Sequence, residues 1–197
     1  DDNAARRKKI QRWIRMYERG GPIADAIDAY ALFALTNGYE LVCEDGADGL
    51  KDQVQAWLDQ PWVDMDQIFA DGILSAVLAG DAYQEIIPTR TGQGVWGIVS
   101  RDPSTFGKNC DEYGRITGYS QYTPGKSGLT EEETPIEPDR ILSFSLFHVP
   151  GQVYGLSIMD RAEDDINRDC DTIESITKAI HRHGTPKNQW AIGSDEH

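Results

Sequence analysis

Carboxylates that could gather a divalent cation cluster in one short stretch of the sequence. The acidic run Glu163–Asp165 is followed about one helical turn later by Asp169, and such groups can hold metal ions for phosphoryl chemistry. Di-metal sites in helix bundles combine glutamates with a Glu-x-x-His motif, and the sequence has no such motif. The cluster therefore favours a solvated helix face, or the wall of an anionic channel, over a metal site.

A glycine-rich run at residues 92–97 (Gly-Gln-Gly-Val-Trp-Gly) has the spacing of a phosphate-binding loop. A dinucleotide site needs a strand before this run and a helix N-terminus after it, so that backbone amides point at the pyrophosphate. Here strand-like sequence flanks the run on both sides, and the lysine strand and catalytic loop of a kinase are missing. The run predicts the flexible turn of a β-hairpin.

Two further patterns also fall short of a metal site. The acidic run 44–49 lacks the alternating ligands and the distal glutamate of a calcium loop. His181 and His183 are two residues apart on a predicted helix, where they do not share a face. No Ser-His-Asp or Cys-His arrangement stands out, so we predict no catalytic residue, no metal ligand, no cofactor and no enzymatic activity.

The helix that carries the acidic cluster is the best-marked element of the chain. Ser157 is a good N-cap, with Asp160 at the reciprocal position of a capping box, and Gly184 and Pro186 end the helix. Acids crowd the first half and bases the last turns, as the helix dipole favours. Apolar or small residues recur every three or four positions and form one stripe, made of Ile158, Ala162, Ile166, Cys170, Ile173, Ile176 or Thr177, and Ile180.

Other elements are placed by turn and cap signals. A basic amphipathic helix begins the chain, and two more helices follow Gly21 and Gly49. Asp64 caps a fourth helix, with Gln67 at the reciprocal position and Gly80 as its stop; its sequence is apolar almost all round and predicts burial. Strands are predicted at 39–43, 83–87, 95–100, 116–122, 140–147 and 189–192, and the polar segment 123–138 is predicted to be a loop.

Composition excludes some classes of protein. The 197 residues carry a net charge of −14, which does not suit a protein that grips DNA phosphates along its whole surface. No apolar run approaches the roughly 18 residues of a membrane span. The acidity is compatible with a DNA channel that does not hold phosphate, and equally with solubility or adaptation to salt. The three widely spaced cysteines match no metal pattern, and we interpret them as buried or free thiols.

The order of several short motifs resembles the portal proteins of tailed viruses. The motifs are Gly-Asp-Ala-Tyr at 80–83, Asp-Pro-Ser-Thr at 102–105, Gly-Arg-Ile-Thr-Gly-Tyr at 114–119, Arg-Ile-Leu-Ser-Phe at 140–144, Tyr-Gly-Leu-Ser at 154–157 and His-Gly-Thr-Pro at 183–186. The resemblance covers roughly residues 64 to 190. Ser143 differs from the histidine that many portals carry there, and portal chains usually run to several hundred residues.

The resemblance implies an α+β portal-like fold with a helical wing and two long stem helices that flank a small β-rich clip module. It implies a wing part at 1–63, a first stem helix at 64–81, a clip-like module at 82–150, a second stem helix at 151–184 and a returning wing strand at 185–197. The subunit would form a ring, usually a dodecamer, at the capsid vertex of the virion after assembly in the host cytoplasm. Double-stranded DNA would pass through without sequence readout, and the terminase large subunit, the head–tail adaptor and the capsid protein would be partners, with no membrane involved.

Site residues follow from that resemblance. Candidates for the channel wall or the contact between stems are Asp164, Asp165, Arg168 and Lys178. The stripe Ile158, Ala162, Ile166, Cys170, Ile173 and Ile180 would pack on the helix at 64–80 and on the neighbouring subunit. The loop at 123–134 would dock a partner through Thr123, Lys126, Glu131, Glu132 and Glu133.

Two alternatives from other classes remain open. A metal- or nucleotide-dependent enzyme would join the acidic helix and the glycine-rich hairpin at one pocket. A monomeric interaction module would dock an acidic partner through the basic first helix, which carries Arg6, Arg7, Lys8, Lys9, Arg12, Arg15 and Arg19. The other interpretation of that helix, which we favour, is a solvated face anchored to the body by Trp13 and Tyr17.

Overall fold

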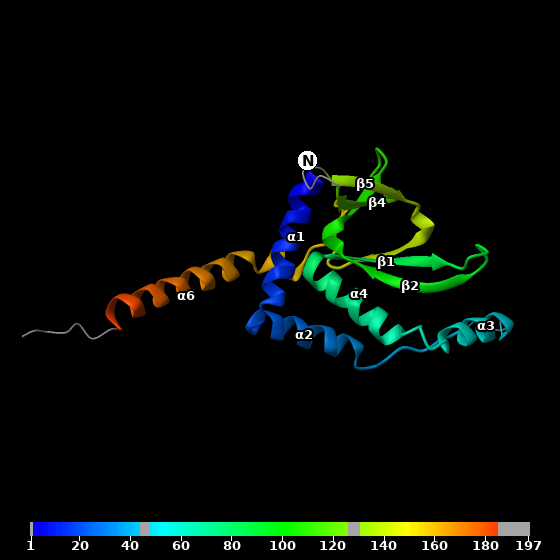
Figure 1. The fold of residues 1–197 in the computed structure, drawn as a ribbon, viewed down its shortest axis with the longest axis horizontal. Helices are drawn as coiled ribbons and strands as arrows, with labels where there is room; N and C mark the ends of the chain where they lie inside the picture. Colours follow the sequence, from blue (N-terminus) through cyan, green and yellow to red (C-terminus); the bar gives the residue numbers. More distant parts are fainter. Residues whose placement is uncertain (1, 44–47, 126–130, 185–197) are drawn as a thin grey trace, which may run out of the picture. The chain divides into compact units, whose positions relative to one another are not determined.

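The computed structural model describes residues 2–43, 48–125 and 131–184, which form a mixed α+β fold (Figure 1). The chain divides into two compact units, Asp1–Asp160 and Arg161–His197. The predicted α+β class is confirmed, and the elements below are described unit by unit.

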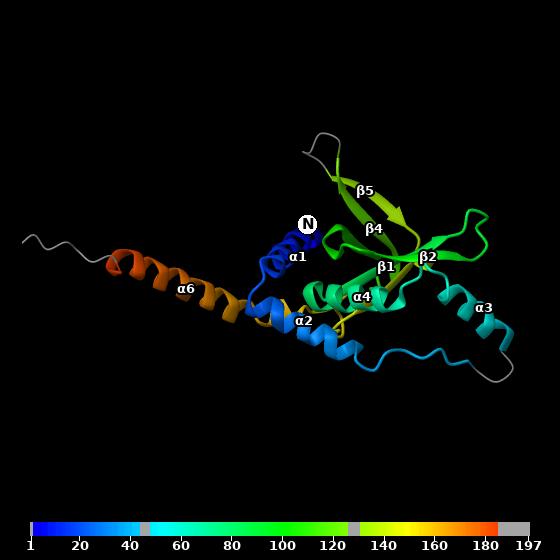
Figure 2. The same cartoon turned by 60° about the horizontal axis from the view of Figure 1, so that its bottom comes forward.

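Helices α1, α2 and α4 of the first unit contact one another (Figure 2). Helix α1 spans Asp2–Glu18 and buries Ile10 and Trp13, which are 3% and 1% exposed. Helix α2 spans Pro22–Leu35 and begins at the proline that the sequence marked. Helix α3 spans Asp48–Leu58.

Helix α4 spans Met65–Ala79 and has both predicted end signals. The Asp64 carboxylate accepts a hydrogen bond from the backbone N–H of Gln67 at 3.0 Å, and Gly80 ends the helix in the left-handed region at φ 81°. The reciprocal half of the capping box is not formed, because the Gln67 side chain donates to Asp71 instead. The last four residues of α4 are buried, as its apolar sequence predicts.

Strands β1 (Asp81–Pro88), β2 (Val95–Arg101) and β6 (Ile141–Ser145) form an antiparallel sheet in the order β2-β1-β6. The glycine-rich run closes the β1–β2 hairpin: the Thr89 N–H donates to the Gly94 carbonyl at 3.1 Å. Gly92 and Gly94 have φ values of 72° and 91°, which only glycine adopts at low cost. The hairpin prediction is confirmed.

A second antiparallel sheet contains β3 (Phe106–Cys110), β4 (Ile116–Pro124) and β5 (Glu131–Ile136) in that order. Two short 3₁₀ helices, η1 (Pro103–Thr105) and η2 (Pro138–Arg140), connect the strands of the two sheets. The predicted loop at 123–138 is therefore wrong over β5, since Thr123 pairs with Glu132 in a β4–β5 ladder. Strand β3 was not predicted.

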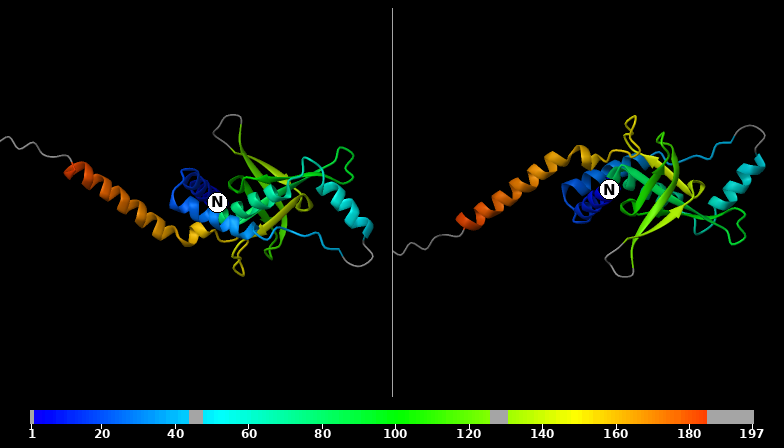
Figure 3. Two further views of the ribbon diagram at one scale, coloured as in Figure 1. Left: turned by 90° about the horizontal axis from the view of Figure 1, so that it is seen from below. Right: turned by 90° about the horizontal axis from the view of Figure 1, so that it is seen from above.

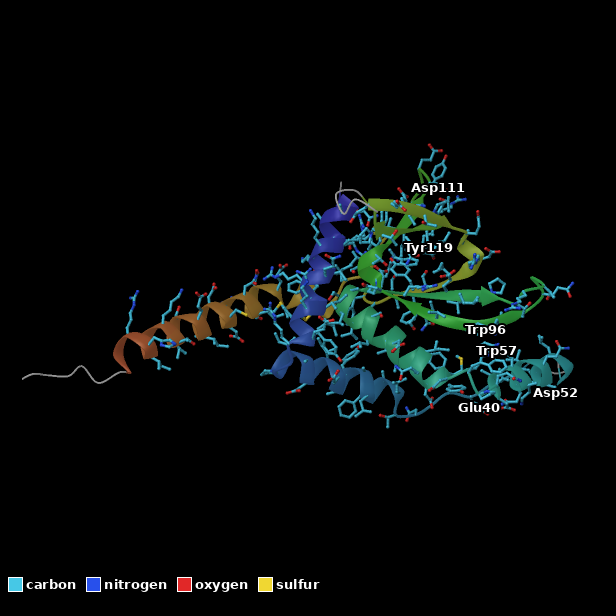
Figure 4. The ribbon with its side chains drawn as sticks, viewed as in Figure 1. Glu40, Asp52, Trp57, Trp96, Asp111 and Tyr119 are labelled. Carbon is cyan, nitrogen blue, oxygen red and sulfur yellow. The ribbon has the colours of Figure 1, made fainter. Side chains whose placement is uncertain are left out.

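Figure 3 shows the strands of the two sheets, coloured green to yellow, from two further sides. A small aromatic core joins the two sheets. Tyr83 of β1 stacks on Phe106 of β3 with ring centroids 5.1 Å apart and meets Tyr119 of β4 edge-on at 5.9 Å. Ile141 of β6 completes the cluster. Burial, with the Asp81 carboxylate nearby, raises the pKa of Tyr83 well above its ordinary value. Figure 4 shows Tyr119 between the sheets.

The helix predicted from Ser157 onward is interrupted. A short α5 spans Ile158–Arg161, Ala162 leaves helical geometry with φ −100° and ψ 5°, and α6 spans Glu163–His183. Ser157 does cap α5, accepting from the Met159 N–H at 2.9 Å. Asp160 does not complete a capping box, because its carboxylate pairs with Lys9 at 2.7 Å. The single continuous helix was thus an incorrect prediction.

Two other strand predictions have different outcomes. Residues 39–43 form no strand, although they alternate in polarity. The predicted strand at 189–192 and the Pro186 stop lie outside the described residues.

Candidate functional site: a buried charged junction

Asp81, the first residue of β1, is a fully buried carboxylate. One of its oxygens accepts from Lys108 Nζ at 2.7 Å and from Ser145 Oγ at 2.6 Å, and the other accepts from Arg6 Nη2 at 2.5 Å. The backbone N–H of Gly155 adds a fourth contact at 3.2 Å. Asp81 therefore joins α1, both sheets and the segment that precedes α5.

Lys108 of β3 is the buried partner, with its side chain 2% exposed. Its ammonium donates to Asp81, to Ser145 Oγ at 2.9 Å and to the Val153 carbonyl at 3.0 Å. An ammonium has three donors, and these contacts use all of them. A buried ion pair is tolerated only when its remaining polar atoms are also paired, which is the case here.

Arg6 of α1 closes the junction at its edge. Its guanidinium lies 3.9 Å from the centre of the Tyr154 ring, and Nη2 also donates to the Ala79 carbonyl at 3.2 Å. The Tyr154 hydroxyl accepts from the Lys108 N–H at 3.0 Å. Burial raises the pKa of Tyr154, so this phenol stays neutral at ordinary pH.

Backbone contact replaces side-chain packing where Gly80 meets Gly155. A Cβ on Gly155 would lie 2.1 Å from the Gly80 carbonyl oxygen and 2.5 Å from that of Leu146. The Leu146 N–H donates to the Gly80 carbonyl at 2.7 Å, and the Leu156 N–H donates to Leu146 at 2.9 Å. Both glycines are therefore required by space.

Ser157 satisfies the end of α4. Its hydroxyl contacts the carbonyls of Val77 at 3.1 Å and Leu78 at 2.7 Å, which are among the last carbonyls that a helix leaves without intrahelical partners. The two motifs at 80–83 and 154–157, far apart in the sequence, thus meet at one place. Their residues fix the end of α4, both sheets and the start of α5 as one rigid joint.

The contacts of this junction hold elements of the fold together and leave no reactive group free. The buried lysine is fully hydrogen-bonded to a carboxylate, a hydroxyl and a carbonyl, so it is neither a free nucleophile nor a general base. Nothing in the sequence marked Lys108 or Ser145, and Asp81 stood out only as part of the Gly-Asp-Ala-Tyr motif at 80–83. The sequence did contain one signal for the junction: Asp81 directly follows Gly80, which ends α4, and begins β1.

The candidate channel charges lie on α6 and are exposed. Arg168 pairs with Asp165 at 3.4 Å, and Lys178 pairs with Glu174 at 2.5 Å, each within the helix. Asp164 is exposed in the first turn. The structure thus brings three of the four into intrahelical pairs, and it does not test a role in a channel.

The predicted stripe divides into two halves. Ile166 is 7% exposed and Ala162 and Ile158 are half-buried, whereas Cys170, Ile173 and Ile180 are exposed. Ile173 and Ile180 are 65% and 62% exposed. The second half of the stripe is thus the exposed half.

The candidate docking segment is a hairpin arm rather than a loop. Glu131, Glu132 and Glu133 lie on β5 opposite Thr123 and its neighbours on β4, while Lys126 lies outside the described residues. Arg7 donates to Glu131 at 2.7 Å, and this hydrogen bond lowers the pKa of that carboxyl.

The bases of α1 bind within the first unit. Arg6 pairs with Asp81, Arg7 with Glu131 and Lys9 with Asp160, and Arg7 also lies 3.8 Å from the centre of the Tyr122 ring. This arrangement supports the interpretation that α1 is anchored to the body. It leaves fewer bases for an acidic partner.

The enzyme alternative gains no support from the described residues. No group of three or more histidines, cysteines, aspartates or glutamates in them is placed to hold a metal ion. A cavity of about 310 Å³ lies among α1, α4 and β2, and one of about 730 Å³ lies between α1 and residues 151–156. Neither is lined by the hairpin glycines.

Within the described parts of the chain, every helix is too short or too polar to cross a lipid bilayer.

The chain is similar to known proteins in its structure, at low sequence identity. No protein-family model and no curated protein matches the sequence. Among solved structures, a chain from the neck of a native gene transfer agent (GTA) particle, computed with C12 symmetry, is 18% identical with a TM-score of 0.61, over 86% of this chain and 44% of that one. A chain from the virion of the native particle is 17% identical with a TM-score of 0.66, over 91% and 46%.

The neck of the empty particle, computed with C6 symmetry, gives a TM-score of 0.62 at 18% identity, over 89% of this chain and 45% of that one. The likeness shows a shared fold. This chain spans slightly less than half the length of each of these three chains.

Proposed function

We propose that this chain is a structural subunit of a phage-like head–tail junction, and specifically a portal subunit. The observation that carries the proposal is the fold shared with chains of the GTA neck and virion over 86% to 91% of this chain. The proposed role is not enzymatic, in keeping with a central joint whose charged groups are paired internally.

The motif order adds independent support. The portal-like motifs at 80–83 and 154–157 form the contact between Gly80 and Gly155 and share the Asp81 network. A joint of this kind suits a subunit that must hold its shape while DNA moves past it. In the proposed assignment, α4 and α6 are stem helices, the two sheets form the clip-like module and α1 to α3 belong to the wing.

The proposed assembly is a ring at the capsid vertex. One neck that shares this fold was computed with C12 symmetry, which supports a twelve-membered ring here. The acidic α6 would contribute to a channel through which double-stranded DNA passes without sequence readout. The terminase large subunit, a head–tail adaptor and the capsid protein are the proposed partners, and residues 123–134 are the proposed docking segment.

Light scattering followed by negative-stain imaging across a range of salt tests the proposal. The expected result is a particle of many subunits with a central hole. A monomer at every protein and salt concentration would contradict assembly by this chain alone, and metal and nucleotide binding would then be measured to test the enzyme alternative.

A further inference from the structure

The cavity of about 310 Å³ among α1, α4 and β2 has an apolar floor. Leu78 and Pro103 are buried in its lining, and Ile14 and Leu74 are half-buried beside them. These residues belong to α4, η1 and α1, which contact one another within the first unit. Binding pockets span about 300–1,000 Å³, so a cavity at the lower end of that range suits a single apolar side chain.

Three carboxylates form the more exposed rim of this cavity. Glu18 of α1 and Asp102, which precedes η1, are exposed, and Asp71 of α4 is half-buried. Asp71 accepts from the Gln67 side chain through Oδ1, and Asp102 accepts from the N–H of Ser104 through Oδ1. Each of these two carboxylates therefore keeps its second oxygen for a further donor. Because the three acids come from different elements, they surround the apolar floor rather than lie along one helix.

The negative charge of the rim is not balanced by bases in the lining. Of the described residues that line the cavity, only Arg101 is basic. Its guanidinium is held by Glu85, to which Nε donates at 2.9 Å. Arg15 and Arg19 are exposed neighbours of Glu18 on α1, but neither lines the cavity. The cavity thus combines an apolar floor with a net negative rim.

One buried polar atom of the lining also lacks a partner. The Ser100 hydroxyl is buried and has no hydrogen-bond partner within the described parts of the chain. Nearly all buried polar groups in native proteins are paired. This hydroxyl is therefore a further acceptor for a hydrogen-bond donor that a ligand brings.

We propose that this cavity is a docking site for a basic segment of another protein. An apolar side chain of that segment enters the cavity, and arginines or lysines on either side of it meet Glu18, Asp71 and Asp102. Complementary charge of this kind selects the partner and fixes its register. A second copy of the chain complements the rim poorly, since it carries 33 acids and 19 bases. The inference is independent of the proposed portal role.

Binding of a short peptide tests the site. The probe is a dye-labelled peptide of sequence Gly-Arg-Leu-Arg-Gly with blocked ends, and its fluorescence anisotropy reports binding to the natural chain. Replacing both arginines of the probe by citrulline, which keeps the shape and removes the charge, should weaken binding about tenfold or more. Replacing the leucine of the probe by glycine should weaken binding by a similar factor, because the apolar anchor is lost.

Variants of the chain locate the bound probe. Glu18→Gln and Asp71→Asn should each weaken binding about three- to fivefold, which is the effect of a partly exposed ion pair. The matched control is Asp66→Asn, which removes the same charge from an exposed position of α4 outside the cavity and should leave binding unchanged. All measurements are made at about 0.15 M salt, where distant charges are screened over about 8 Å. Thermal unfolding checks that the variants remain folded.

Three results would overturn the inference. The first is the absence of saturable binding by the arginine probe. The second is an equal loss of binding for Asp66→Asn and Asp71→Asn, which would show general attraction to an acidic surface. The third is dissociation of oligomers of the natural chain by the probe, measured by light scattering, because the cavity would then be occupied by a second copy. Rings that persist with the probe bound support both the docking site and its independence from ring formation.

Discussion

The backbones of Gly80 and Gly155 touch, although the two residues are 75 positions apart in the sequence. A Cβ on Gly155 would lie 2.1 Å from the Gly80 oxygen, and a Cβ on Gly80 would lie 2.3 Å from the Gly155 oxygen. The contact brings the end of α4 against the segment that leads into α5. The two glycines therefore act as one structural unit.

Gly155→Ala should destabilise the first unit strongly. The added methyl group would meet three backbone atoms, which cannot move aside as a side chain can. Overpacking typically costs about 1–3 kcal/mol and sometimes more, and we expect a loss of about 3 kcal/mol in the free energy of unfolding. Urea denaturation followed by circular dichroism measures it.

Gly97→Ala is the matched control. Gly97 is buried in β2, but no atom beyond its own residue and its two chain neighbours lies within 4 Å of its hypothetical Cβ. Its free energy of unfolding should differ from that of the natural chain by about 0.5 kcal/mol or less. Equal losses for the two variants would show that the contact between Gly80 and Gly155 carries no special cost.

Lys108→Met should leave the Asp81 carboxylate buried with an incomplete set of partners. Breaking a buried ion pair from one side typically costs about 3–5 kcal/mol, and we expect a loss in that range. Asp81→Asn should cost less in the Lys108→Met background than in the natural chain, because the contact between Lys108 and Asp81 is already lost there while Arg6 still pairs with Asp81. Urea denaturation of the two single variants and the double variant measures the coupling.

The exposed pair of Glu174 and Lys178 provides the comparison. Both side chains are about two-thirds exposed, at 64% and 65%, and solvent-exposed pairs contribute little. Glu174→Gln should change stability by about 0.5 kcal/mol or less. A loss for Lys108→Met no larger than this would mean that the buried network does not stabilise the joint.

Local signals predicted much of the fold. Helix α4 was placed correctly because Asp64 and Gly80 mark its ends by cap chemistry that depends only on neighbouring residues. The β1–β2 hairpin was placed for the same reason. Strand β5 was missed because Glu131–Ile136 contains three glutamates and a proline, and its pairing with β4 is decided by tertiary structure rather than propensity.

The junction was less predictable than the elements around it. Lysine is almost never fully buried without a partner, so the sequence alone predicts a surface position for Lys108. Only the folded chain shows that Asp81 and Tyr154 contact it and that Arg6 contacts both of those residues. Residues 39–43 show the converse: their alternation resembles a strand, but no neighbouring strand pairs with them in the described residues.

The pair of Arg7 and Glu131 should make a small, pH-dependent contribution to stability. The hydrogen bond from Arg7 lowers the pKa of Glu131 from its ordinary value of 4.5 in the folded state. The stability that this pair adds is therefore present above the pKa that Glu131 has in the unfolded chain. It is lost as the pH falls through the lower pKa that Glu131 has in the folded chain. Because Glu131 is 59% exposed, solvent screening keeps the effect small.

Thermal unfolding of the natural chain and of Glu131→Gln measures that effect. The difference in melting temperature should be present at pH 7 and should disappear at pH values below the folded pKa. Glu132→Gln removes a carboxylate from the same strand without changing the Arg7 contact and serves as the control. A difference that persists or grows in acid would contradict the assigned pair.

Cys170 should report whether assembly covers the stripe on α6. Both Cys170 and Cys110 are exposed in the single chain, so both should react with a small maleimide. Cys110 should react more slowly than an ordinary thiol, because partial burial raises its pKa and the thiolate is the reactive form. If neighbouring copies pack on α6, ring formation should slow the labelling of Cys170 by about tenfold or more. Mass spectrometry of timed, quenched samples of the assembled and the dissociated chain gives both rates, and Cys110, which lies on β3, is the internal reference. An unchanged rate at Cys170 in assembled rings would mean that the stripe remains open to solvent and that the ring is held by other faces.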